Sequence, residues 1–246
     1  MMRSMLAVVL AVVVAGTGAC GGRDDRAVTI DAGDGTSTQA NDNPEVEPPD
    51  DPAGDELTQK QVNAALLTVA DLPSGWTLGE PSEDDSDDSD NDKIAPAKCG
   101  ELVDAMSADE EDAAAEGERN FNKGGPFGTL MGVSISSYED EVDSDKLNEI
   151  ADVFGECSSF KGTDMEGVVS EYKVAPLSLA NIGDKSLALT MTVESEGFTI
   201  PINIYLVVIG HNLMTFYNGG ITGADGADLE TFGKLAIKRL EKTVKG

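Results

Sequence analysis

Three consecutive segments in the C-terminal half constrain the fold of this chain most. They are Ser186–Val193, Phe198–Ile209 and Leu213–Asn218, which are rich in residues that favour strands. The turns between them are only Ser195-Glu196-Gly197 and Gly210-His211-Asn212. Connections this short join antiparallel neighbours. The sequence therefore predicts an antiparallel sheet as the organising element.

The rest of the chain adds strands and amphipathic helices. Further strands are predicted at Arg119–Phe121, Leu130–Tyr138 and Val168–Val174, and helices from Thr58 to before Pro73, around Cys99–Met106, at Ser144–Glu156 and at Asp228–Val244. The acidic segment Asp109–Glu116 is ambiguous and is consistent with an extension of the second helix. Because apolar helix stripes must be covered by a sheet, we expect an α+β fold with an antiparallel sheet of five to six strands and helices packed on one face.

The first helix carries the most specific local signal. Thr58 and Gln61 have the spacing of a capping box, and Leu57 can pack on Val62 as a hydrophobic staple. The folded domain is therefore expected to begin at Leu57 and to occupy residues 57–246 as one α+β unit. The chain's one tryptophan, Trp76, is expected to fill the core.

The first twenty residues indicate export. Arg3 precedes an unbroken apolar run from Met5 to Ala15, and small residues then lead directly to Cys20. The run is shorter than the roughly 20 residues that a membrane-spanning helix requires. It resembles a bacterial lipoprotein signal, although Thr17 stands where Leu or Val is usual. The resemblance implies that residues 1–19 are a signal peptide and that Cys20 carries acyl chains at the outer side of the cell membrane.

Residues 20–56 are predicted to form a disordered acidic tether behind the lipidated cysteine. They are rich in Asp, Glu, Gly, Thr, Asn and Pro and contain almost no large apolar side chain. Such a segment buries too little surface to offset its loss of conformational entropy. We therefore expect it to hold the domain away from the membrane.

Cysteine usage agrees with an exported protein. If Cys20 carries lipid, Cys99 and Cys157 remain as a pair. A bridge between them would stabilise the fold by about 4 kcal/mol on the chain-entropy estimate. Two reduced, buried thiols are the alternative.

Charge limits the partners of the domain. The formal net charge is -29, so a nucleic acid is excluded as a general partner and an anionic membrane surface is disfavoured. Residues 83–92 are the densest acidic run, with Asp88, Asp90 and Asp92 spaced as in a calcium loop. Lys93 and Cys99 occupy the positions of the required Gly and Glu, so a solvated loop and no metal site are predicted.

The sequence offers little for catalysis. Its one histidine, His211, lies in a predicted hairpin turn, and no nucleophile elbow, phosphate loop, dinucleotide fingerprint or zinc spacing is present. We therefore expect no enzyme and no cofactor. A cell-envelope hydrolase that uses two carboxylates remains the alternative.

Alternation along the strands suggests a binding face. It places apolar side chains on one sheet face, to be covered by helices: Val133, Ile135, Leu187, Leu189, Met191, Ile200, Ile202, Ile204, Met214 and Phe216. The opposite face would then collect uncharged polar groups: Ser134, Ser136, Thr190, Thr192, Asn203, Tyr205, Thr215 and Tyr217. Such groups line ligand clefts. The alternative is that Ser, Thr and Tyr simply suit strands.

Several short motifs, in order, resemble one family. They are Leu66-Leu67-Thr68-Val69-Ala70-Asp71-Leu72-Pro73-Ser74-Gly75-Trp76, the segment Cys157–Phe160, Pro176-Leu177 and Ile182-Gly183-Asp184. Together they are similar to the PknH-like extracytoplasmic sensor domains, which occur as actinobacterial lipoproteins and on receptor kinases. The resemblance implies a curved sheet with helices on its convex side and a cleft that binds an unidentified ligand. Members usually carry a second disulfide, for which this chain has no cysteines.

These observations predict a membrane-anchored, extracytoplasmic, non-catalytic domain. Its ligand would be a small molecule, lipid, glycan or peptide bound in the sheet-lined cleft. A protein-protein interaction module is the third alternative.

Overall fold

The computed structural model describes residues 54–79, 93–101, 113–125, 128–164, 167–221 and 223–244, all within one compact unit. The predicted signal peptide, Cys20, most of the tether and the acidic run 83–92 lie outside the described residues. The same holds for Leu102, Val103 and Met106 of the predicted second helix, of which residues 97–101 are described and helical.

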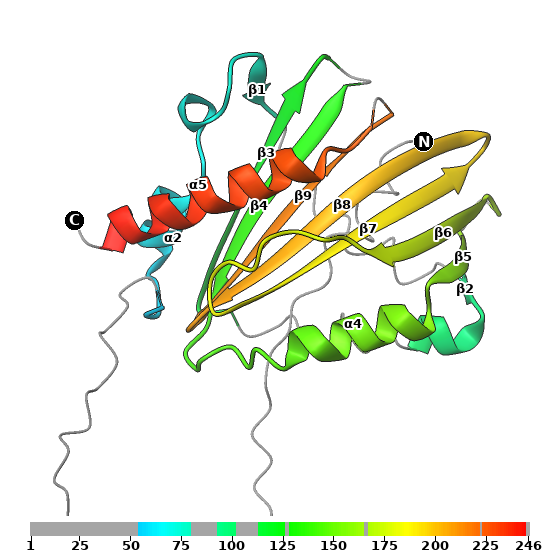
Figure 1. Ribbon diagram of the computed structural model, residues 1–246, viewed down its shortest axis with the longest axis horizontal. Helices are drawn as coiled ribbons and strands as arrows, with labels where there is room; N and C mark the ends of the chain where they lie inside the picture. Colours follow the sequence, from blue (N-terminus) through cyan, green and yellow to red (C-terminus); the bar gives the residue numbers. More distant parts are fainter. Residues whose placement is uncertain are drawn as a thin grey trace, which may run out of the picture. The chain divides into compact units, whose positions relative to one another are not determined.

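One antiparallel sheet forms the centre of the domain (Figure 1). Its strands are β1 Trp76–Leu78, β2 Lys93–Ala95, β3 Ala115–Lys123, β4 Thr129–Ser137, β5 Ser159–Thr163, β6 Val169–Pro176, β7 Lys185–Ser195, β8 Phe198–Ile209 and β9 Asn212–Gly219. Their order across the sheet is β1-β3-β4-β9-β8-β7-β6-β5-β2. The predicted antiparallel α+β architecture is confirmed.

The sheet has nine strands among the described residues, so the expected five to six was too low. The strands that were missed are β1, β2 and β5, which have three, three and five residues. Segments this short show too little alternation to be recognised, and β1 and β2 form the two edges, where natural sheets use short strands. In addition, β3 begins at Ala115, so the end of the ambiguous acidic segment is strand and not helix.

Besides the helical residues 97–101, the described helices are α2 Gln59–Ala65, α4 Lys146–Glu156, α5 Gly226–Val244 and the short 3₁₀ helix η1 Val69–Asp71. The predicted capping box is confirmed, because the Thr58 side chain accepts from the Gln61 amide and the Gln61 side chain accepts from the Thr58 amide. The first helix nevertheless ends at Ala65, well before Pro73. Leu66 is the C-cap residue, and its backbone leaves the helical conformation with φ -57° and ψ 136°.

Helices cover both faces of the sheet, which corrects the expected one-sided packing. Along β8, Tyr205, Val207 and Ile209 pack in one cluster with α2 and α5, whereas Leu206 and Val208 pack in a second cluster with α4. We call these two sides the α5 face and the α4 face. The helix α5 contacts β8 and β9, and α4 contacts β6 and β7, so each face is covered over a different part of the sheet.

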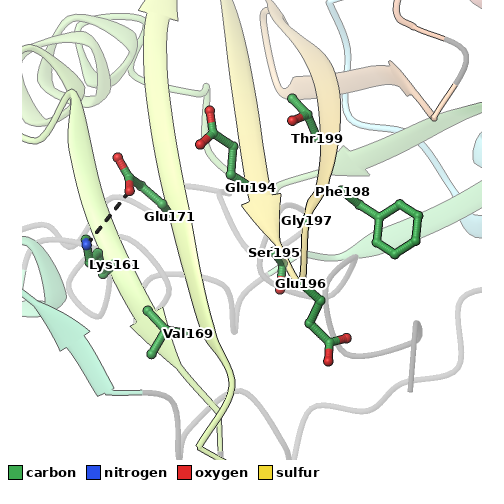
Figure 2. A pocket seen from close by; sticks show the side chains of 9 residues that line it. All are labelled: Lys161, Val169, Glu171, Glu194, Ser195, Glu196, Gly197, Phe198 and Thr199. Carbon is green, nitrogen blue, oxygen red and sulfur yellow. Dashed lines mark ion pairs between the residues drawn. The ribbon is translucent and has the colours of Figure 1, made fainter.

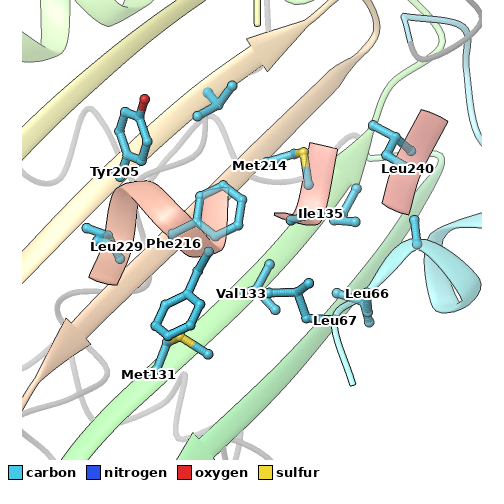
Figure 3. Packing of buried hydrophobic residues seen from close by; sticks show 14 of the residues in the cluster. Leu66, Leu67, Met131, Val133, Ile135, Tyr205, Met214, Phe216, Leu229 and Leu240 are labelled. Carbon is cyan, nitrogen blue, oxygen red and sulfur yellow. The ribbon is translucent and has the colours of Figure 1, made fainter. Parts of the chain in front are cut away.

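The core of the α5 face is dense and mostly aliphatic (Figure 3). Met214 and Phe216 from β9 lie beside Val133 and Ile135 from β4, under α5. Trp76 is 5% exposed and meets Phe232 of α5 edge to face, with 5.8 Å between ring centroids, so its predicted place in the core is confirmed.

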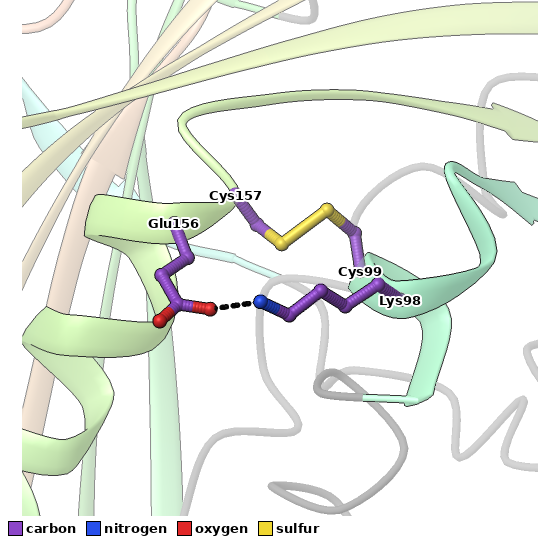
Figure 4. Close-up of a disulfide and its surroundings, with 4 residues drawn as sticks. All are labelled: Lys98, Cys99, Glu156 and Cys157. Atoms are coloured by element: carbon purple, nitrogen blue, oxygen red, sulfur yellow. Dashed lines mark hydrogen bonds and ion pairs between the residues drawn. A yellow bond between two sulfur atoms is a disulfide. The ribbon is translucent and has the colours of Figure 1, made fainter.

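The core of the α4 face includes the disulfide between Cys99 and Cys157 (Figure 4). The two Cα atoms are 5.7 Å apart, and Cys157 directly follows α4. Lys98 and Glu156, each next to a bridged cysteine, form an ion pair beside it. The predicted pairing is thus present in the structure.

The segment that precedes α2 is bonded to the turn between β8 and β9. The backbone amide of His211 donates to the Gly54 carbonyl at 2.8 Å, and the Asn212 side-chain amide donates to the Asp55 carbonyl at 2.8 Å. The segment that leads into α2 is therefore fixed to the β8–β9 turn.

Candidate functional site

The eight predicted binding residues do not share one face. The registers place Ser134, Ser136, Thr215 and Tyr217 on the α4 face and Thr190, Thr192, Asn203 and Tyr205 on the α5 face. The predicted apolar set divides in the same way. Val133, Ile135, Met214 and Phe216 lie on the α5 face, and the members of that set in β7 and β8 lie on the α4 face.

The reason is a change of buried face across the sheet. Alternation within a strand shows which residues lie on the same side, but it does not show which side of the sheet that is. In β4 and β9 the larger apolar side chains pack on the α5 face, whereas in β7 they pack on the α4 face. The predicted apolar set therefore combined residues of β4 and β9, which lie on the α5 face, with residues of β7 and β8, which lie on the α4 face.

The four polar residues on the α4 face form one continuous patch on β4 and β9. Thr215 is paired directly with Ser134, Tyr217 with Gly132, and Leu213 with Ser136. We call Ser134, Ser136, Thr215 and Tyr217 the hydroxyl strip. Every member contributes a group that both donates and accepts hydrogen bonds.

Thr215 is the unusual member of the strip. Its side chain is only 8% exposed, and its Oγ1 atom is buried without a hydrogen-bond partner among the described residues. A buried hydroxyl without a partner costs stability, and most buried polar groups in proteins are therefore satisfied. This hydroxyl can therefore bond a group that the described residues do not supply.

The tyrosine of the strip is held flat against the sheet. Its hydroxyl donates to Asn120 Oδ1 on β3 at 2.7 Å, so the ring reaches from β9 across β4. A Cβ atom at Gly132 would lie 2.1 Å from the Tyr217 ring. Burial, with the nearby Glu118 carboxylate, raises the pKa of Tyr217, so the phenol stays protonated.

Replacing Gly132 by alanine is expected to lower the free energy of unfolding by about 2 kcal/mol, because the Tyr217 ring must move and its bond to Asn120 is lost. Urea denaturation measures the change. Gly155→Ala is the matched control, since a Cβ there meets nothing within 4 Å and alanine favours the helix. Equal stability of G132A and the wild type would contradict the described ring position.

Among the described residues of β3, the charged side chains on the same face as the strip are acidic. On β3, Glu116 and Glu118 lie on the α4 face with the strip, whereas Arg119 and Lys123 lie on the α5 face. Arg119 donates to the carbonyls of Leu66 and Leu67, and the Lys123 ammonium lies 5.6 Å from the centre of the Trp76 ring. Both cations are thus held on the far side of the sheet.

The other four predicted residues lie in different surroundings. Tyr205 is 1% exposed, and its hydroxyl donates to the Ala180 carbonyl, which makes it a core residue. Asn203 is also buried, while Thr190 and Thr192 are half-buried and are paired with Ala175 and Lys173 of β6.

Near these residues, the ends of β5–β8 enclose an open depression of about 430 Å³ (Figure 2). Three of its charged side chains are already paired, in Lys161–Glu171 at 3.8 Å and Lys173–Glu194 at 2.8 Å, and a fourth, Glu196, lies in the turn between β7 and β8. Exposed pairs of this kind contribute little energy and leave few free groups for a ligand.

The catalytic inventory of the described residues is small. His211 lies in the β8–β9 turn, as predicted, and its Nδ1 is 3.1 Å from the Tyr138 carbonyl. Within the described ranges, no three His, Cys, Asp or Glu side chains come together as metal ligands. None of the described helices combines the length and the hydrophobicity that a membrane span requires.

The sequence interpretation missed Asn120 and Gly132. A glycine in the middle of a strand pattern often marks a close approach by another group. The sequence could therefore have indicated that a side chain packs against Gly132. Asn120 carried no such signal, because its role depends on the reach of Tyr217 across β4.

Comparison with solved structures finds the same fold in an extracellular domain. The crystal structure of the extracellular domain of PknH from Mycobacterium tuberculosis aligns with a TM-score of 0.54 at 15% identity, over 78% of this chain and 100% of that chain. An uncharacterised protein from Mycobacterium smegmatis aligns with a TM-score of 0.45 at 10% identity, over 77% and 99%. No sequence family and no curated protein matches the chain. The predicted resemblance is confirmed at the level of the fold.

Proposed function

We propose that this chain, which has the fold of the PknH extracellular domain, is a non-catalytic binding domain outside the cytoplasmic membrane. Acyl chains on Cys20 hold it there, and residues 21–53 connect the lipid to the domain. The signal-like start of the sequence and the Cys99–Cys157 bridge support this location, since disulfides persist in oxidising compartments.

The ligand binds at the hydroxyl strip. The observation that carries this proposal is the buried Thr215 hydroxyl, which has no partner among the described residues. A buried polar atom without a protein partner is commonly satisfied by a ligand or by ordered water, and we assign the ligand role to Thr215 Oγ1. Ser134, directly opposite on β4, places a second hydroxyl beside it.

A Thr215→Val variant separates a binding role from a structural one. Valine keeps the shape and removes the unsatisfied hydroxyl, so the free energy of unfolding should rise by about 1 kcal/mol while ligand binding weakens. Denaturation in urea measures the first effect. Ser137→Ala is the contrasting control, because the Ser137 hydroxyl accepts from the Leu57 amide at 2.8 Å and its loss should destabilise by about 1 to 3 kcal/mol. A destabilised T215V variant would show that the hydroxyl has a structural partner and would reject the site.

Binding is tested with defined probes of three chemical classes. They are neutral trisaccharides, phosphatidylglycerol vesicles and a pentapeptide that ends in D-alanine. The whole chain, purified from membranes in detergent, should bind at least one probe, and T215V should bind it at least about fivefold more weakly. Thr192→Val on the α5 face is the matched control and should bind like the wild type. If no probe binds in a manner that depends on Thr215, the proposed function fails.

A further inference from the structure

We infer that the hydroxyl strip takes a neutral, hydroxyl-rich ligand, that is, a glycan without acidic groups. This inference rests on the proposed function and names the ligand class of the same site. It follows from the charge around the strip, from the groups that the strip presents and from the position of β4 and β9 within the sheet.

Charge selects against an anionic ligand. No Lys or Arg side chain belongs to the α4 face of the described strands β3, β4, β9 and β8, since Arg119 and Lys123 both serve the α5 face. Phosphate and carboxylate groups are commonly bound by such cations. Glu116 and Glu118 instead place negative charge beside the strip, and like charges repel.

The groups of the strip suit a polyol. The hydroxyls of Ser134, Ser136 and Thr215 can each donate and accept, which is the property that sugar hydroxyls share. Next to them on the α4 face, Ile204 is paired with Tyr217 and Leu206 with Thr215. Leu206 is 2% exposed and belongs to the core, whereas Ile204 is half-buried. Ile204 is therefore the aliphatic side chain that can contact the C–H surface of a sugar ring beside its polar contacts.

The location of the strip argues against an extended peptide as the ligand. Peptides commonly bind sheets by adding a strand to an exposed edge, where backbone groups are free. Both β4 and β9 are interior strands, and their backbones are already paired on each side. Side chains must therefore supply the recognition.

The inference is tested by saturation-transfer NMR on the whole chain in detergent, with two matched trisaccharides. α-1,4-Galactotriose is neutral, and trigalacturonic acid differs from it by carboxylates in place of hydroxymethyl groups. Maltotriose and cellotriose extend the neutral set. We expect a neutral trisaccharide to bind, T215V to weaken it at least about fivefold and S134A to weaken it severalfold.

The acidic analogue should bind at least about tenfold more weakly than its neutral counterpart, and the E116Q/E118Q double variant should narrow that difference. Failure of all neutral trisaccharides at millimolar concentration, or equal binding of trigalacturonic acid, would overturn the inference. Binding of phosphatidylglycerol vesicles or of the pentapeptide that T215V abolishes would overturn the glycan class while leaving the proposed function standing. Absence of any Thr215-dependent binding contradicts both.

Discussion

Replacing Phe232 by alanine is expected to lower the free energy of unfolding by about 4 kcal/mol. The side chain is 1% exposed, lies on the face of α5 that packs on the sheet and meets the edge of Trp76. Its removal leaves a cavity between helix and sheet and deletes an aromatic contact. Urea denaturation followed by the fluorescence of Trp76, the chain's one tryptophan, measures the loss.

The matched control makes the same substitution where burial is small. Phe198 is 60% exposed at the start of β8, so F198A should change the free energy of unfolding by less than about 0.5 kcal/mol. Similar losses for F232A and F198A would contradict the docking of α5 on the sheet.

Removal of the disulfide should have an effect of similar size. The Cys99→Ser/Cys157→Ser double variant is expected to lose about 4 kcal/mol, because the bridge closes a loop across a sequence separation of 58 residues and thereby restricts the unfolded chain. Thermal denaturation with and without a reductant measures it. Reductant should lower the melting temperature of the wild type and leave that of the double variant unchanged. A double variant as stable as the oxidised wild type would contradict this role.

Much of the fold could be predicted because its signals are local. The short turns between β7, β8 and β9 determine antiparallel pairing, and Thr58 with Gln61 marks the start of α2. The edge strands could not be predicted, because three residues give no periodicity. The two-sided packing had a signal in Tyr205–Ile209, where five successive residues are buried, as expected of a strand that is covered on both faces.

The site could be predicted only in part. Thr215, Ser134, Ser136 and Tyr217 were identified as polar strand residues, but their separation from Thr190 and Asn203 depends on which face each strand buries. Which face of a strand is buried depends on the helix that packs on it, and these helices are distant from the strands in the sequence. The missing partner of the Thr215 hydroxyl is likewise a property of the packed structure and not of any motif.

A crystal structure of the chain grown with the neutral trisaccharide that binds best tests the proposed site most directly. A sugar oxygen is expected about 3 Å from Thr215 Oγ1, with Ser134 in the same site. A ligand bound elsewhere, or an ordered water that joins Thr215 to fixed protein groups while the strip stays empty, would contradict the proposed site.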